Sequence, residues 1–96
     1  MISRFGNKLA EDVFHGETTR NTRSLPPSLH RIAQRKLQYL NVAKNLNDLR
    51  VPPGNRMEAL KGVLKGSYSI RVNDQWRIVF RWVDGDCYDV LIVDYH

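Results

Sequence analysis

The sequence has a single cysteine, no apolar run of membrane-spanning length, and no internal repeat or low-complexity segment. Because Cys87 is alone, the chain can form neither a disulfide framework nor a thiolate zinc site. No segment approaches the roughly 20 apolar residues of a membrane helix, and residues 1–14 lack the apolar stretch of a signal peptide. We therefore expect a cytoplasmic protein that makes no membrane contact.

Metal-ligand spacing is also missing. The three histidines, His15, His30 and His96, are far apart in the sequence and do not form a ligand pattern with one another. No metal site and no other cofactor is predicted.

Acidic residues are absent from a long basic stretch. No Asp or Glu lies between Thr18 and Asn47, where six cations occur: Arg20, Arg23, Arg31, Arg35, Lys36 and Lys44. Four of the acids gather instead near the end, at Asp84, Asp86, Asp89 and Asp94, and the net charge is +5. Such a surface would attract a polyanion such as nucleic acid, although a basic face without a partner would have the same composition.

The composition is that of a folded domain. With 42% hydrophobic and 26% charged residues in 96, the chain can build one modest core, so we expect one domain over residues 1–96.

The first half of the sequence is predicted to be mainly helical. A short strand could open the chain at residues 1–5, and Asn7 can cap a helix that ends near Gly16. A polar loop leads to Pro26 and Pro27, which suit the first turn of a helix. The apolar positions of that helix recur every three or four residues, at Leu29, Ile32, Ala33, Leu37, Leu40 and Ala43. A short turn with Leu46 and Leu49 should end before Pro52.

The second half is predicted to be a meander of three antiparallel strands, over residues 68–72, 76–83 and 87–96. Alternation places Trp76, Ile78, Phe80 and Trp82 on the face that the helices cover. A three-residue turn at 73–75 would set Val72 opposite Trp76 and Arg71 opposite Arg77. Two facing arginines repel each other, so this pairing favours a phosphate site over a purely structural strand pair.

The last predicted strand carries ionisable residues directly after an apolar run. Val90 to Val93 are apolar on both faces, which indicates a strand inside the sheet. Regular alternation then places Asp94 and His96 on one face and Tyr95 on the other. Arg77 is the residue that we expect to share a site with this terminus.

Two segments carry a resemblance to a known family. Pro52 to Gly62 (PPGNRMEALKG), followed by residues 68–82 (YSIRVNDQWRIVFRW) and the terminal VDYH, resemble the HigB-type toxins of bacterial toxin–antitoxin systems, within the RelE/ParE superfamily. The resemblance runs essentially the whole chain. It implies an α+β, RelE-like fold, in which an N-terminal strand and helices pack on one face of an antiparallel sheet that ends in a three-strand meander. The chain departs from many relatives at Val63-Leu64, where they carry a charged or polar pair.

The same resemblance implies an endoribonuclease that cuts messenger RNA on the translating ribosome and so inhibits translation. Its partner would be a HigA-type antitoxin with a helix-turn-helix domain, and operator DNA would be contacted only through that antitoxin. Two alternatives on the same scaffold stay open: a ParE-like inhibitor of DNA gyrase, and an RNA- or ribosome-binding module without catalysis.

RNA can be cut without a metal when its own 2′-OH attacks the neighbouring phosphate, which requires an acid, a base and cations. Arg77 has the forked guanidinium that matches a phosphate, and RelE-like nucleases carry arginine at the matching position. An exposed salt-bridged arginine is the structural alternative. His96 suits a general acid because the unperturbed pKa of a histidine side chain is about 6.5, and the resemblance implies that the family uses this terminal triplet. Asp94 could orient His96 or take a proton, whereas Tyr95 could transfer a proton, stack a base or simply pack.

The remaining candidates are basic or acidic residues around the predicted site. Lys61 is expected to contact phosphate, while Glu58 could act as an acid or base or pair with Arg56. Further RNA contacts are predicted for Arg56, Lys65, Arg71, Arg20 and Arg23. Arg20 and Arg23, with Arg31 and Arg35, could equally form a solvated surface.

Overall fold

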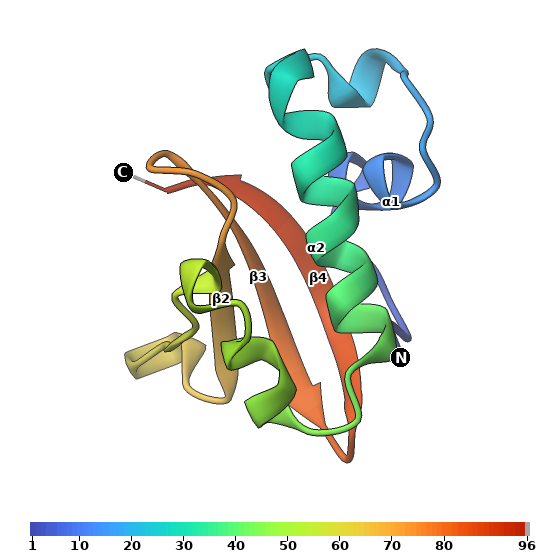
Figure 1. Ribbon diagram of the computed structural model, residues 1–96. Coiled ribbons are helices and arrows are strands. Elements are labelled where there is room, and N and C mark those ends of the chain that lie inside the picture. Colours follow the sequence, from blue (N-terminus) through green and yellow to red (C-terminus); the bar gives the residue numbers. More distant parts are fainter. Residues whose placement is uncertain (96) are drawn as a thin grey trace.

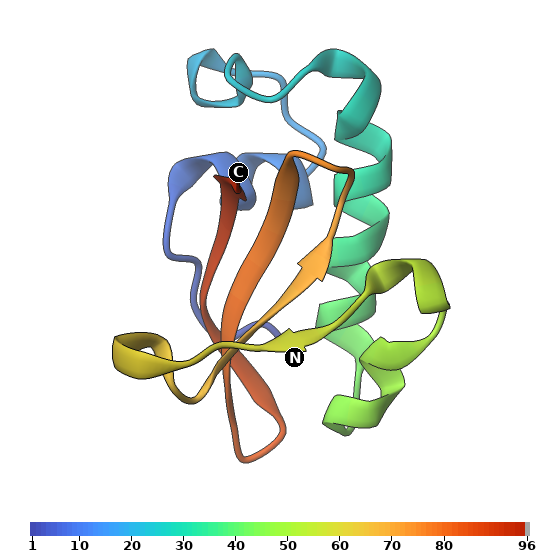
Figure 2. The same cartoon turned by 90° about the vertical axis from the view of Figure 1, so that its left-hand side faces the viewer.

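The computed structural model describes residues 1–95 of the chain. Two α-helices, α1 (Lys8–Phe14) and α2 (His30–Val42), lie on one face of an antiparallel sheet (Figures 1 and 2). The sheet order follows the sequence: β1 (Glu58–Ala59), β2 (Ser67–Arg71), β3 (Trp76–Val83) and β4 (Asp86–Asp94). Short 3₁₀ turns connect these elements at Arg20–Thr22, Pro27–Leu29, Leu46–Arg50, Pro53–Asn55 and Gly62–Leu64. The predicted α+β architecture, with helices on one face and a C-terminal meander, is confirmed.

Asn7 caps α1 as the sequence predicts and also ties the helix to the sheet. Its Oδ1 accepts from the backbone N–H of Ala10 at 2.9 Å, which satisfies a donor that the first helical turn leaves unpaired. Its Nδ2 donates to the carbonyl of Ile92 in β4 at 3.1 Å. One side chain therefore sets both the start of α1 and its position beside β4.

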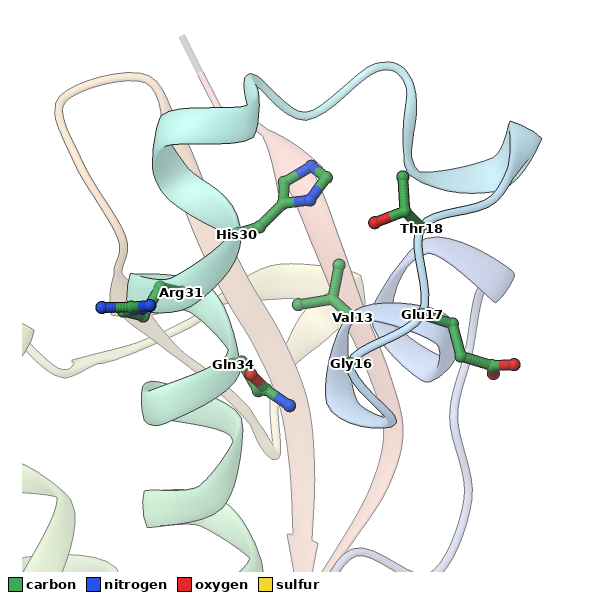
Figure 3. A pocket seen from close by; sticks show the side chains of 7 residues that line it. All are labelled: Val13, Gly16, Glu17, Thr18, His30, Arg31 and Gln34. Atoms are coloured by element: carbon green, nitrogen blue, oxygen red, sulfur yellow. The ribbon is translucent and has the colours of Figure 1, made fainter.

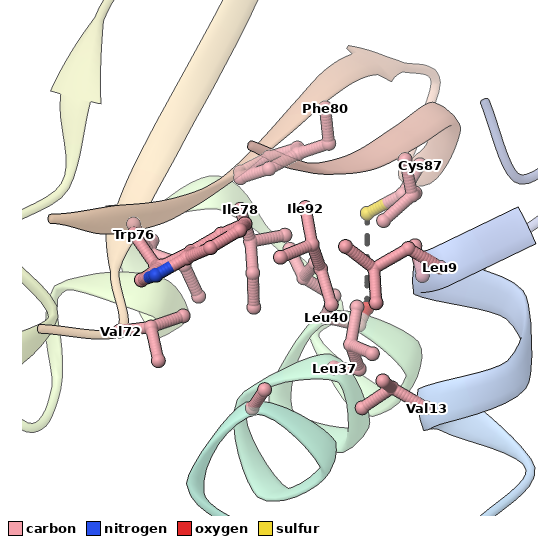
Figure 4. Packing of buried hydrophobic residues seen from close by; sticks show 14 of the residues in the cluster. Leu9, Val13, Leu37, Leu40, Val72, Trp76, Ile78, Phe80, Cys87 and Ile92 are labelled. Atoms are coloured by element: carbon pink, nitrogen blue, oxygen red, sulfur yellow. Dashed lines mark hydrogen bonds between the residues drawn. The ribbon is translucent and has the colours of Figure 1, made fainter. Parts of the chain in front are cut away.

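The core lies between the helices and the sheet (Figure 4). α2 buries Ala33, Leu37 and Leu40, the three- and four-residue spacing expected for one apolar face. The largest side chains that are fully buried include Phe80, Leu37, Leu40, Ile70, Ile78 and Ile92. Trp76 is also buried, whereas Trp82 lies at the margin of this core. The predicted inner face of β3 is therefore correct.

The turn between β2 and β3 has the predicted register. Arg71 lies opposite Arg77, and the N–H of Val72 donates to the carbonyl of Trp76 at 2.9 Å. The side chain of Asn73 stabilises the turn by accepting from the backbone N–H groups of Gln75 and Trp76. The two arginines therefore face each other across neighbouring strands, as the odd loop length requires.

The opening segment differs from a regular strand. Residues 1–5 make two isolated parallel bridges with β4, Ile2 with Cys87 and Phe5 with Val90. Between these bridges Asp89 has a left-handed backbone (φ 53°), so β4 cannot present a continuous edge there. These bridges cover the outer edge of the first half of β4. Toward the end of β4, the side chain of Asn7 donates to the carbonyl of Ile92.

β1 was not predicted, because two residues are too few to show a periodic pattern. Glu58 lies opposite Ser69, and Ala59 lies opposite Tyr68. The next turn is closed by the N–H of Leu60 donating to the carbonyl of Ser67 at 2.9 Å. This short pairing brings the segment around Glu58 onto the sheet. No helix within residues 1–95 is long and apolar enough to span a bilayer.

Candidate active site

Arg77 is held rigidly on the face of the sheet that the helices leave free. Its Nε donates to Oγ of Ser69 at 2.8 Å, and its Nη2 donates to the carbonyl of Arg56 at 2.6 Å. The same Nη2 lies 3.4 Å from the carbonyl of Ser69. Arg77 is only 8% exposed, so it is not the exposed surface arginine of the structural alternative. The chain fixes the plane of the guanidinium before any ligand binds.

Two predicted site residues, Glu58 and Tyr95, lie against this guanidinium. Nη1 lies 3.6 Å from Oε1 of Glu58, whose side chain is 57% exposed. The ring of Tyr95 lies under the guanidinium, with its centroid 5.7 Å from Cζ of Arg77, the geometry of a cation–π contact. The ion pair of Glu58 is thus with Arg77 and not with the neighbouring Arg56. We call the cluster of Arg77, Glu58 and Tyr95 the Arg77 site.

The strand register explains why Tyr95 and not Asp94 joins the Arg77 site. Arg77 lies opposite Val93, and Trp76 lies opposite Asp94. Because side chains alternate along a strand, Val93 and the following odd-numbered Tyr95 take the face of Arg77, while Asp94 takes the face of Trp76. Tyr95 does not pack against the helices, the structural alternative that the sequence left open.

Asp94 lies at the turn between β2 and β3. Its Oδ2 accepts from Nε2 of Gln75 at 2.9 Å, and the N–H of Tyr95 donates to the carbonyl of Gln75 at 2.6 Å. By the register of β3 and β4, Asp94 lies on the opposite face of the sheet from Arg77, and its predicted pairing with His96 stays a prediction. His96, the predicted proton donor, lies outside the described residues.

Arg56, Lys61 and Lys65 are close in sequence to Glu58 of the Arg77 site. Arg56 has a left-handed backbone (φ 43°) that turns its carbonyl toward Arg77, and its side chain is exposed. Lys61 and Lys65 are exposed on the loop after β1 and line an open pocket of about 480 Å³ together with Ala59, Leu60, Gly62, Gly66, Ser67 and Tyr68. The tip of this loop carries Val63 and Leu64, both exposed. The roles predicted for Arg56, Lys61 and Lys65 stay predictions.

Arg71 extends the positive charge of the Arg77 site toward α2. Its side chain pairs with Asp74, whose own side chain is almost fully solvated. Its carbonyl accepts from Nζ of Lys36 at 2.6 Å. The sequence analysis counted Lys36 only as one cation of the basic stretch. The position of Lys36 directly before the buried Leu37 could have indicated that its side chain lies at the margin of the apolar face of α2 and so can reach the sheet.

Arg20 and Arg23 lie in and next to the turn Arg20–Thr22, and both are exposed. This turn is held to α1 by Asp12, whose Oδ2 accepts from Oγ1 of Thr19 at 2.6 Å and from Nδ2 of Asn21 at 3.1 Å. These hydrogen bonds lower the pKa of the Asp12 carboxyl. Neither arginine is tied to the Arg77 site, so RNA contact by them stays a prediction.

A second pocket, of about 210 Å³, lies between α1 and α2 (Figure 3). It is lined by Val13, Gly16, Glu17, Thr18, His30, Arg31 and Gln34. A ring nitrogen of His30 lies 2.8 Å from the carbonyl of Leu25, and Nε2 of Gln34 donates to the carbonyl of Phe14 at 3.3 Å. Two of its polar side chains, His30 and Gln34, contact backbone carbonyls. Of the predicted catalytic residues that the structure describes, none lines this pocket. Within residues 1–95, no three His, Cys, Asp or Glu side chains are grouped so that they could hold a metal ion.

Comparison with known sequences extends over nearly the whole chain. Residues 3–96 match the family described as the RelE-like toxin of the type II toxin–antitoxin system HigB. The chain is 46% identical over 85 residues to Toxin HigB-1 of Vibrio cholerae, which covers 88% of this chain and 87% of that protein. It is 34% identical over 61 residues to Endoribonuclease HigB of Proteus vulgaris, which covers 64% and 65% of the two chains.

Comparison with solved structures supports the same fold. The YoeB–YefM toxin–antitoxin complex of Staphylococcus aureus contains a chain with a TM-score of 0.61 at 18% identity, covering 100% of this chain and 98% of that one. A variant of YafQ from E. coli has a TM-score of 0.56 at 17% identity, covering 98% and 93%. At this identity the likeness concerns the fold alone. The family match over residues 3–96, together with the 46% identical relative, shows that the chain belongs to the HigB-like family of RelE-like toxins of type II toxin–antitoxin systems.

Proposed function

We propose that this toxin is an endoribonuclease that cuts messenger RNA on the translating ribosome, without a metal ion. The observation that carries the proposal is the Arg77 site. Its guanidinium is oriented by hydrogen bonds to Ser69 and to the carbonyl of Arg56, its Nη1 faces the exposed carboxylate of Glu58, and its Cζ lies over the ring of the exposed Tyr95. The relative from Proteus vulgaris, named as an endoribonuclease, supports the reaction class.

The proposed reaction is attack of the RNA 2′-OH on the adjacent phosphorus. The bond between the 2′-oxygen and phosphorus forms, the bond to the 5′-oxygen breaks, and the products are a 2′,3′-cyclic phosphate and a free 5′-OH. Arg77 stabilises the extra negative charge on the phosphorane through Nη1, the nitrogen that faces the exposed Glu58. A preorganised donor of this kind typically contributes 10²- to 10³-fold in rate.

The two proton transfers are assigned to ionisable groups around Arg77. Glu58 is exposed and 3.6 Å from Nη1, which suits a base that takes the proton of the 2′-OH. His96 remains the proposed donor to the leaving 5′-oxygen, with Asp94 as the group that orients it. The ring of Tyr95 stacks against the guanidinium, and its hydroxyl is a further group able to donate or accept a proton. Lys61, Lys65, Arg56 and Arg71 are proposed to contact the RNA backbone, and Arg20 and Arg23 the ribosome.

The proposed partner is a HigA-type antitoxin that binds operator DNA and holds the toxin silent in the cytoplasm. Membership of a type II family supports an antitoxin partner, and the YoeB–YefM complex shows that a protein of this fold assembles with one. A HigA-type protein encoded beside this chain, and its co-purification with it, would test this assignment.

The decisive experiment maps RNA 5′ ends in a translation extract. Wild type should cut translated messages and leave 2′,3′-cyclic phosphate and 5′-OH ends, which are the products of attack by the RNA 2′-OH rather than by a metal-activated water. Glu58→Gln, Tyr95→Phe and His96→Ala should each reduce cutting, with acid–base losses of about 10²-fold or more. Lys44→Met, on an exposed lysine away from the site, serves as the control.

Three outcomes would overturn the proposal in different ways. Intact messages together with lost gyrase supercoiling would indicate a ParE-like inhibitor. Co-sedimentation with ribosomes without any cut would indicate a binding module. Cutting of free RNA at the same rate as translated RNA would remove the ribosome from the mechanism.

A further inference from the structure

Lys36 of α2 reaches the edge of β2 beyond the point where β1 ends. β1 pairs only with Tyr68 and Ser69. On that edge the carbonyl of Ser67 accepts from Leu60, and carbonyls two residues apart on a strand point to the same edge. The carbonyl of Arg71 therefore faces outward with no strand beside it, and it accepts from Nζ of Lys36 at 2.6 Å.

The surroundings of Lys36 are positive. Burial lowers the pKa of its ammonium, and the charges of Arg71, Arg35 and Arg77 lower the pKa further, while no carboxylate acts in the opposite direction. Two acids pair with these arginines, Asp74 with Arg71 and Glu58 with Arg77, and both carboxylates are exposed. Asp74 is 97% exposed, and Glu58 lies 3.6 Å from Arg77. Exposed carboxylates of this kind offset little of the repulsion among four cations.

A purely structural role explains only part of this arrangement. The carbonyl of Arg71 needs only one N–H donor. The neutral side-chain amide of an Asn or Gln could supply it without placing another positive charge beside the arginines. The ammonium of Lys36 has three donors, and one of them serves Arg71. Two donor positions of the ammonium remain at the sheet edge, beside the backbone of Arg71, the residue whose Cα lies opposite that of Arg77.

We propose that Lys36 and Arg71 form a second phosphate-binding position at the open edge of β2, which takes a phosphate of the same RNA strand as the one at Arg77. The inference rests on the proposed function for the identity of the ligand. Directly opposite residues on antiparallel strands have Cα atoms only about 5 Å apart, so Arg71 and Arg77 can serve neighbouring phosphates. Lys36 then anchors the RNA on the α2 side of the sheet.

The test measures binding of a single-stranded RNA whose 2′-oxygens are methylated, so that it cannot be cut by 2′-OH attack. Lys36→Met keeps the apolar stem and removes the charge and its donors. Because a single-strand phosphate contact contributes about 0.7 to the slope of log K against log salt, the slope should fall by about 0.7. Fluorescence anisotropy of labelled RNA over a salt series gives this slope.

Lys44→Met is the matched control, because it removes the same charge from an exposed residue just after α2. Its slope should equal that of wild type, and Lys36→Arg, which keeps a cation, should also retain the wild-type slope. If Lys36→Met fails to fold by circular dichroism, Arg71→Met replaces it, with the same expected fall of about 0.7.

The proposal is overturned if Lys36→Met, or Arg71→Met in its place, has the slope of the Lys44→Met control, or if wild type does not bind this RNA. Cleavage of translated messages is scored separately in wild type. An unchanged slope with normal cleavage refutes only the second phosphate position, whereas a reduced slope without cleavage in wild type refutes only the nuclease activity.

Discussion

Replacing Arg77 by alanine should destabilise the folded protein as well as affect RNA cleavage. The side chain donates to Oγ of the fully buried Ser69 at 2.8 Å and to the carbonyl of Arg56 at 2.6 Å. Hydrogen bonds from charged groups contribute about 1.5–3 kcal/mol each, and they share one side chain, so their sum is an upper bound. We expect Arg77→Ala to lower the free energy of unfolding by about 3 kcal/mol.

Ser69→Ala removes one of these bonds and leaves Nε of Arg77 without its acceptor, which should cost about 1–2 kcal/mol. Because the two residues contact each other, the double variant should lose less than the sum of the single variants, by at least about 0.5 kcal/mol. Urea unfolding followed by tryptophan fluorescence measures all four proteins. Tyr95→Phe is the stability control, since Tyr95 is 43% exposed and keeps its ring.

The reasoning fails if Arg77→Ala unfolds within about 0.5 kcal/mol of wild type, or if the two single variants add without coupling. If it holds, Arg77→Ala is a poor probe of catalysis when used alone. The activity of this variant must then be expressed per folded molecule, and the Glu58→Gln and Tyr95→Phe variants carry the catalytic argument.

Three further predictions concern the rest of the fold. Asn7→Ala should cost about 2 kcal/mol, since it removes the cap of α1 and the bond to Ile92, whereas Asn7→Ser should recover the capping part; urea unfolding compares them. Gly6→Ala should cost about 1–3 kcal/mol, because its Cβ would lie 2.5 Å from Cδ2 of Leu91, and a melting temperature equal to wild type would contradict this. Burial raises the pKa of the Cys87 thiol from 9.0 to about 12, so the folded state keeps a proton that the unfolded state loses; the free energy of unfolding should therefore fall between pH 9 and pH 12, by about 1.4 kcal/mol per pH unit. The difference between wild type and Cys87→Ala over this pH range isolates the thiol, and a constant difference would refute its protonated burial.

Local patterns were sufficient to predict the elements that carry most of the core. The apolar positions of α2 follow from the helical period, and Asn7 is a cap because its side chain is short and accepts from the first turn. The odd number of turn residues after Val72 fixes Arg71 opposite Arg77, because alternation along a strand has a period of two. These features depend on residues close together in sequence.

Contacts between distant segments were not predictable in the same way. β1 is two residues long, and the opening segment makes single bridges because β4 bends at Asp89. The grouping of Tyr95 with Arg77 depends on the register between β3 and β4, which the alternation of β4 alone does not give. The contact between Lys36 and Arg71 joins residues 35 positions apart and needs α2 to pass beside the end of β2.

By itself, then, the sequence determined the type of each main element, the inward faces of α2 and β3, the facing arginines and the family, since these follow from local periodicity, turn length and recognisable motifs. Only the tertiary structure decided which ionisable groups meet. The backbone around Arg56 turns its carbonyl onto Arg77, the strand register selects Tyr95 over Asp94, and the shortness of β1 leaves an edge that Lys36 fills. The physical reason is that these contacts join side chains to backbone groups on other strands and helices, whose positions are set by packing over the whole core.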